Sequence, residues 1–240
     1  MKKLLTLLSF AALGGYAFAI DLYTQSPHTP GASGADGLSG FTGDLGSGMF
    51  DRDIADTFTV TGLGWTVNQV RSSWVQFTNG DTNPVTAVNV EFYMDTGGVG
   101  ALVAAATNVT VGVSDGPGTY FGRTEKIITS NFDSVNLAPG NYFVHIQPVV
   151  NHNWFWLTSD PTTAVQGLPA HFRRGPNTDP TLDTTWPSAW TPTPGPGPIF
   201  SGAHDVNFVV AGQPVPEPAT MAALGLGLAT LVARRRRRKA

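Results

Sequence analysis

Three aspartates, Asp51, Asp53 and Asp56, form the densest acidic group in this chain of 240 residues. Carboxylate oxygens are the ligands that Ca²⁺ prefers, and the ion takes about six to eight of them. The group lacks the glycine and the distal glutamate of an EF-hand loop. The sequence indicates no other cofactor, so calcium at these three residues is the one candidate. A solvated loop that leads into the first predicted strand is the alternative interpretation.

Flat aromatic side chains can stack on sugar rings, and three of the six tryptophans are candidates for this role. Trp74 alternates with Val75 in a predicted strand, which predicts an exposed position for Trp74. Trp186 and Trp190 lie in or beside a proline-rich stretch, where exposure is also expected. Large aromatic residues fill cores as well, and Trp154 and Trp156 fit that role. The sequence therefore predicts a candidate exopolysaccharide site at Trp74, Trp186 and Trp190.

The sequence contains no defined motif of a hydrolase. Sequence signatures of serine hydrolases, zinc proteases and nucleotide-binding loops are missing from the predicted body. Ser201, His204 and Asp205 are close in sequence, but a catalytic triad needs an orientation that adjacency does not provide. His145 and His152 flank a predicted turn and could face each other across a hairpin. Because the chain has no cysteine, thiol catalysis is excluded. We predict no catalytic residue and no enzymatic activity, with a secreted hydrolase as an alternative.

The elements that position these residues have the two-residue period of β-strands. The predicted strands are 57–61, 73–78, 88–95, 109–113, 142–147, 153–157 and 206–210. Turn residues such as Thr96-Gly-Gly and Ala138-Pro-Gly-Asn separate them. The pattern predicts an all-β domain over 49–212, an antiparallel β-sandwich or jelly roll. A Gly/Ser-rich segment over 20–48 precedes it, and 187–198 is a proline-rich loop.

The first 19 residues have the pattern of a signal peptide. Lys2 and Lys3 give a positive start, and Leu4–Leu13 is apolar. Ala17 and Ala19 form the small-x-small pattern that signal peptidase cleaves, which predicts a cut after Ala19. The chain is therefore expected to be exported.

The last 28 residues, 213–240, combine three features. Pro216, Glu217 and Pro218 lie within the segment 215–220, where the two prolines keep the chain extended. An uncharged stretch over 219–233 follows; as a helix of about 1.5 Å per residue it predicts a short transmembrane segment. Six cations close the chain, and they are expected to stay cytoplasmic. They are Arg234, Arg235, Arg236, Arg237, Arg238 and Lys239.

This three-part tail resembles the PEP-CTERM sorting signal of Gram-negative bacteria. The resemblance implies recognition and cleavage by an exosortase, a transient stay in the inner membrane, and export to the cell surface or extracellular matrix. The predicted body also resembles a common type of PEP-CTERM passenger. That second resemblance implies no particular activity and is carried by Ile54–Val60 followed by Gly64 and Trp65, the 88–95 strand, Leu137–Tyr142, Trp154–Trp156 and Asp205–Gly212.

Charge supports this expectation of export and excludes one class of partner. Without the signal peptide and the sorting tail, six basic and 16 acidic residues remain, a formal net charge of about −10. An acidic surface repels nucleic acid, so no nucleic-acid partner is expected. The sequence predicts an exported surface or matrix protein, with an exopolysaccharide-binding module and a secreted hydrolase as the alternatives.

Overall fold

The computed structural model describes residues 19–27, 37–39, 52–76, 85–150, 154–159, 170–174, 191–192, 205–217 and single positions of the tail. These residues form twelve strands, which are, in chain order, β1 (Ile20–Gln25), β2 (Gly37–Ser39), β3 (Arg52–Val60), β4 (Trp65–Gln76), β5 (Ala87–Asp95), β6 (Val99–Tyr120), β7 (Arg123–Leu137), β8 (Gly140–Pro148), β9 (Trp154–Leu157), β10 (His171–Arg174), β11 (Thr191–Pro192) and β12 (Phe208–Pro214). The predicted all-β class is confirmed.

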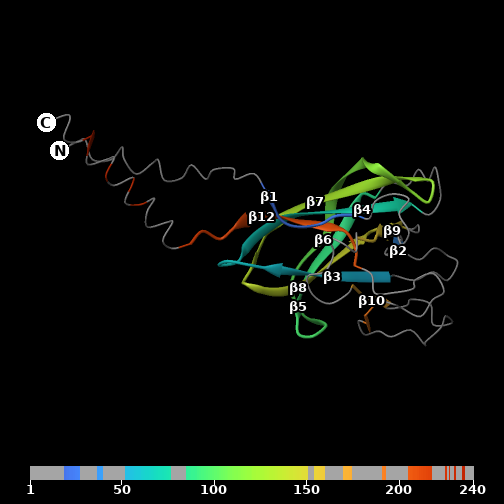
Figure 1. Cartoon of the computed structure of the whole chain (residues 1–240), viewed down its shortest axis with the longest axis horizontal. Coiled ribbons are helices and arrows are strands. Elements are labelled where there is room, and N and C mark those ends of the chain that lie inside the picture. The colour runs from blue at the N-terminus through green and yellow to red at the C-terminus, as the bar shows by residue number, and fades with distance from the viewer. Residues whose placement is uncertain are drawn as a thin grey trace.

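The strands pair into one curled antiparallel sheet, ten of them in the order β1-β12-β4-β7-β6-β5-β8-β3-β10-β11, while β9 pairs beside this path with β4 and with β2. Strand β6 belongs to both halves of the sheet, because its first part pairs with β5 and its part from Val111 onward pairs with β7. The change of partner follows a β-bulge at Asn108, which has a φ of 51°. Its N–H donates to Oδ1 of Asn89 at 2.9 Å. Bulges bend a strand in this way, and the two halves curl around one body (Figure 1).

An aromatic core fills the space between the two halves. Phe58 of β3 lies at its centre, fully buried, with ring centroids of five other aromatic residues within 5.8–6.3 Å. These five are Tyr23, Trp65, Phe92, Tyr142 and Phe208. Because they come from β1, β4, β5, β8 and β12, this one cluster joins both halves of the sheet.

Strand β1 extends the body beyond its predicted start at residue 49. Ile20 lies opposite Gly212 of β12, and Gln25 lies opposite Phe208. Gln25 is buried, and Tyr23 packs on Phe208 with ring centroids 5.3 Å apart. β1 itself contains no glycine or serine, and the Gly/Ser-rich residues of the predicted segment 20–48 begin only after it, at Ser26. The body therefore begins at Ile20, directly after the predicted signal peptide.

Candidate functional site

The sorting motif leaves the body at the end of β12. Pro214 lies opposite Trp65 of β4, and the next N–H, that of Val215, donates to the carbonyl of Gly64 at 2.9 Å. Pro216 and Glu217 then follow, exposed and without regular secondary structure. Pro218 lies outside the described residues. The motif is thus presented to solvent one residue after the last hydrogen bond to the sheet.

Two glycines allow the backbone to pack closely at the point where the chain leaves the sheet. At Gly212, a Cβ atom would lie 2.1 Å from the carbonyl oxygen of Thr66 in β4. At Gly64, the φ is +109° and a Cβ atom would lie 2.5 Å from the carbonyl oxygen of Leu137. Any larger side chain would push β12 or the turn before β4 out of place. These two positions fix the end of β12 against the sheet.

The predicted signal-peptide cut lies at the same end of the body. Ala19 is exposed and Ile20 is the first residue of β1, so a cut after Ala19 leaves the strand intact. Ile20 pairs with Gly212, four residues before Pro216. In Figure 1 the start of β1 and the end of β12 lie side by side. Ala17 lies outside the described residues.

In the tail, Gly225, Gly227, Thr230, Arg234 and Arg235 are helical and exposed. The hydroxyl of Thr230 donates to the carbonyl of Gly227 at 2.8 Å. The cations from Arg236 to Lys239 lie outside the described residues. Among the positions that the structure does describe, no helix has the length and hydropathy that a bilayer crossing requires.

The expected exposure of Trp74 is wrong. Trp74 is 0% exposed, stacks on Trp156 with centroids 5.2 Å apart, and donates its Nε1–H to Oγ of Ser72 at 2.7 Å. Trp74 and Val75 do alternate, but both faces of β4 are covered here, so both side chains are buried. Trp74 therefore points into the main core, and Val75 packs in a smaller cluster on the other face.

With Trp74 buried, the carbohydrate prediction depends on Trp186 and Trp190. Both lie outside the described residues, so a platform at these two positions stays a prediction.

The structure separates two of the three predicted calcium ligands. Asp53 and Asp56 are three residues apart on β3, and residues at odd spacings on a strand point to opposite faces. Asp53 contacts Gln147 on one face, and Asp56 contacts Gln25 on the other. In the parts of the chain that are described, no three His, Asp or Glu side chains come together as metal ligands. Asp51 lies outside them, so calcium at Asp51 stays a prediction.

Asp56 is instead the acceptor at the centre of a buried network that joins β1 to the segment just before β12. One carboxylate oxygen accepts the Nε2–H of Gln25 at 2.9 Å and the backbone N–H of Val206 at 2.7 Å. The other oxygen accepts the N–H of Thr57 at 2.7 Å. Complete burial, together with the charge of nearby Asp205, raises the pKa of Asp56 well above its usual range. This network fixes β1 and the start of β12 onto β3.

A second buried cluster lies on the opposite face of the sheet, on β3, β8 and β5. The Nδ1 atom of His145 lies 3.0 Å from Oε2 of Glu91, and its Nε2 atom lies 3.4 Å from Oδ1 of Asp53. Burial alone lowers the pKa of His145. Hydrogen bonds to Asp53 and Glu91 and the charges of these carboxylates outweigh this effect, so the pKa lies above its ordinary value of 6.5. The arrangement favours an imidazolium held between two carboxylates.

The His145 cluster has the chemistry of a structural ion network. The side chains of His145 and Asp53 are only 2% and 6% exposed, so a substrate would have to displace packed groups to reach them. The hairpin pairing of His145 with His152 stays untested, because His152 lies outside the described residues. His171 is also buried, edge-on to Phe143 with ring centroids 5.0 Å apart. Sequence reasoning missed the His145 cluster because its three members come from separate strands whose order and register the sequence does not give.

Comparison with known proteins identifies the tail. Residues 214–238 match the PEP-CTERM protein-sorting motif. The match begins at Pro214, the last residue of β12, so the motif starts where the sheet ends. No curated protein matches the chain. The predicted PEP-CTERM sorting motif in the tail is confirmed, and the β-rich body fits the passenger expected before such a tail.

Proposed function

Because the chain carries a PEP-CTERM sorting motif, we propose that it is an exported protein whose acidic β-rich body is delivered to the cell surface or extracellular matrix. The motif implies export to the envelope or surface of a Gram-negative bacterium and processing by an exosortase-type enzyme. The observation that carries the proposal is the match at residues 214–238 together with the exposed Pro216 and Glu217 at the end of the sheet.

The chain's segments act in order. The signal peptide begins export, and signal peptidase cuts after Ala19. The apolar segment 219–233 then holds the tail in the inner membrane, while the cations Arg234–Lys239 stay cytoplasmic. Cleavage close to Pro216–Pro218 frees the body from this anchor. The short span between the sheet and the membrane segment supports this order, since the enzyme finds an extended substrate beside the bilayer.

The body acts as a non-enzymatic surface protein with a β-sandwich architecture. Two features support this. Its buried titratable groups, Asp53, Asp56 and His145, take part in networks that join strands. Its net charge of about −10 favours solubility outside the cell.

Intact-mass measurement of the protein recovered from the cell surface or medium tests the proposal. We expect a chain that begins at Ile20 and lacks Arg234–Lys239. In a strain without the exosortase-type enzyme, the same chain should keep its tail and stay with the inner membrane. A mature surface protein that retains Arg234–Lys239 would overturn the proposal.

A further inference from the structure

The fold places both processed ends of the chain at one end of the body. Ile20, the first residue after the predicted signal peptide, pairs with Gly212. Among the described residues, Val215 is the last one bonded to the sheet, through the carbonyl of Gly64. Only 216–218 separate it from the predicted membrane segment. An extended residue spans at most about 3.6 Å, so this end of the body lies within roughly 15 Å of that segment.

Side chains at this end form an apolar surface that we call the end patch. It consists of Ile20, Leu63, Ala138, Pro139 and Val215, all of which are exposed. Leu63 is 46% exposed in the turn between β3 and β4, and the hydrogen bond of Val215 to Gly64 places these two side by side. Ala138 and Pro139 form the turn after β7, which lies at the same end because Trp65 pairs with Leu137.

The end patch also lacks charge, in contrast to the acidic body. The turns 60–65 and 136–141 contain no charged residue. Asp21, beside Ile20, is paired with Arg71 at 2.5 Å. Glu217 lies on the departing chain. An uncharged apolar surface can approach lipid without desolvating an ion, which would cost several kcal/mol.

We propose that the end patch docks on the lipid surface of the inner membrane while the sorting tail is still anchored. This inference rests on the proposed function, because the tail must hold the body at the bilayer. Lipid is the occupant that the fold favours, since the linker is too short to carry the patch away from the bilayer. Docking would orient the body with β12 directed at the membrane, so the processing enzyme would meet the motif in one geometry.

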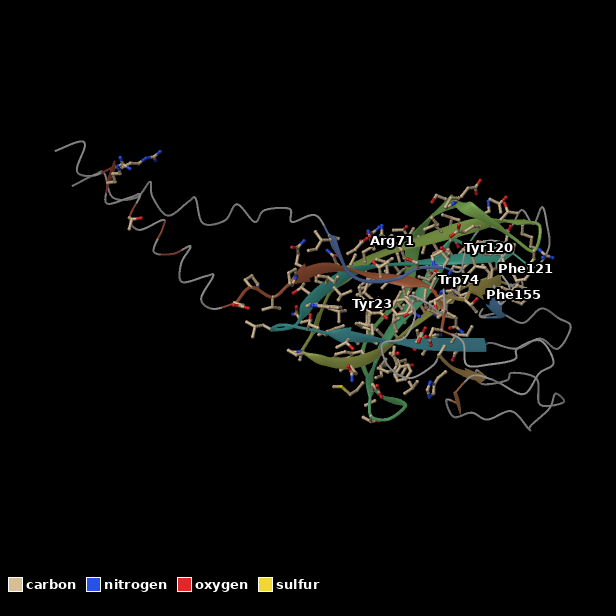
Figure 2. The ribbon with its side chains drawn as sticks, viewed as in Figure 1. Tyr23, Arg71, Trp74, Tyr120, Phe121 and Phe155 are labelled. Atoms are coloured by element: carbon tan, nitrogen blue, oxygen red, sulfur yellow. The ribbon has the colours of Figure 1, made fainter. Side chains whose placement is uncertain are left out.

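Site-specific fluorescence on the full-length chain in lipid vesicles tests the proposal. The chain has no cysteine, so Leu63→Cys accepts a single polarity-sensitive label. Phe121→Cys is the matched control: Phe121 is 55% exposed and lies at the end of the body far from the end of β12 (Figure 2). Vesicles of phosphatidylethanolamine and phosphatidylglycerol carry a lipid-attached quencher, and iodide serves as the quencher in water. Flotation of the vesicles separately reports whether the tail anchors the chain.

We expect the label at position 63 to be quenched by the lipid-attached group and shielded severalfold from iodide, while the label at 121 stays open to iodide. Equal iodide access at both positions in a chain that floats would overturn docking and leave the anchor intact. A chain that does not float would overturn both. Shielding at position 63 that persists in detergent and grows with protein concentration would assign the patch to a second copy, against the lipid proposal.

Discussion

The Nδ1 atom of His145 lies 3.0 Å from Oε2 of Glu91, on the face of the sheet opposite the aromatic core. Strand alternation produces this placement, because Val144 and Ile146 on either side of His145 point into the core. On its other side the imidazole meets Asp53 of β3. A positive charge on His145 therefore joins three neighbouring strands, and the stability of this contact depends on pH.

We predict that the protein becomes less stable as the pH rises from 6 to 9. The pKa of His145 is raised in the folded state above its ordinary value of 6.5. The stabilisation that protonated His145 gives the folded state is therefore complete below about pH 6.5, and it is lost as the pH rises through the pKa of His145 in the folded state. A pKa that is higher by one in the folded chain than in the unfolded chain adds about 1.4 kcal/mol to the free energy of unfolding. Urea unfolding at a series of pH values measures this loss.

His145→Gln should remove the part of this pH dependence that His145 contributes, whereas Asp56, whose folded pKa is also raised, adds a loss of the same sign in wild type and variant alike. Asp115→Asn is the control, because Asp115 forms an exposed ion pair with Lys126 on the β6–β7 hairpin. That variant should keep the slope between pH 6 and 9, since it leaves His145 and its two carboxylate partners in place. A wild-type protein whose stability is flat or rises over this range would contradict the prediction.

Trp74→Ala should destabilise the body by about 3–5 kcal/mol, the usual cost of truncating a buried tryptophan. Trp74 is fully buried against Trp156, so its removal leaves a cavity that rigid strands cannot close. Phe121→Ala, at an exposed hairpin tip, should change stability by no more than about 0.5 kcal/mol. Denaturant midpoints of the two variants measure the difference. A loss below about 1 kcal/mol for Trp74→Ala would mean that the indole is not a core group.

Alternation in the sequence predicted well that these segments form strands, but it did not always predict which face of a strand is buried. Alternation in 88–95 puts Val88, Val90, Phe92 and Met94 on one face, and the first three are buried in the core while Met94 is exposed. In β4 the alternation of Trp74 with Val75 also holds, yet the expected exposure of Trp74 was wrong, because both faces of the strand are covered and both side chains are fully buried. Whether a second face of a strand is covered depends on elements far away in sequence, so the alternation of one strand does not reveal it.

The networks of Asp56 and His145 were hidden for a related reason. Their members are polar residues on predicted strands, which normally indicate a solvent-exposed face. Tyr93 and Glu91 alternate with the core residues Val90 and Phe92, and Tyr93 is nevertheless only 7% exposed and donates its hydroxyl proton to Glu91. Both faces of β5, β8 and β3 carry buried residues, and this depends on parts of the chain far away in sequence. The tail was predictable because its three features are contiguous.

Asp56→Ala should destabilise the body by at least about 3 kcal/mol. The change removes the carboxylate acceptor of the Thr57 and Val206 N–H groups and one of the acceptors of the Gln25 amide, which keeps the carbonyl of Val206, and each unsatisfied buried donor costs about 1–3 kcal/mol. Asp133→Ala is the control, because Asp133 is exposed. Its effect should stay within about 0.5 kcal/mol. Equal unfolding midpoints for the two variants would contradict the assigned role of the Asp56 network.

Gly212→Ala should loosen the end of β12 and make the sorting motif easier to cleave. The added methyl group would lie 2.1 Å from the carbonyl oxygen of Thr66 and 2.9 Å from Cα of Val67, so β12 must move away from β4. Overpacking of this kind costs about 1–3 kcal/mol. Gly112→Ala is the matched control, since a Cβ atom there meets nothing within 4 Å, and it should be neutral or slightly stabilising.

Amide hydrogen exchange of the full-length chain measures the loosening. In Gly212→Ala the N–H of Val215 should exchange faster, because its bond to Gly64 depends on the register of β12. Limited proteolysis should then cut the chain near the end of β12 in Gly212→Ala and spare that segment in Gly112→Ala. If Val215 exchanges at the wild-type rate in both variants, the close packing of Gly212 on β4 does not control access to the motif.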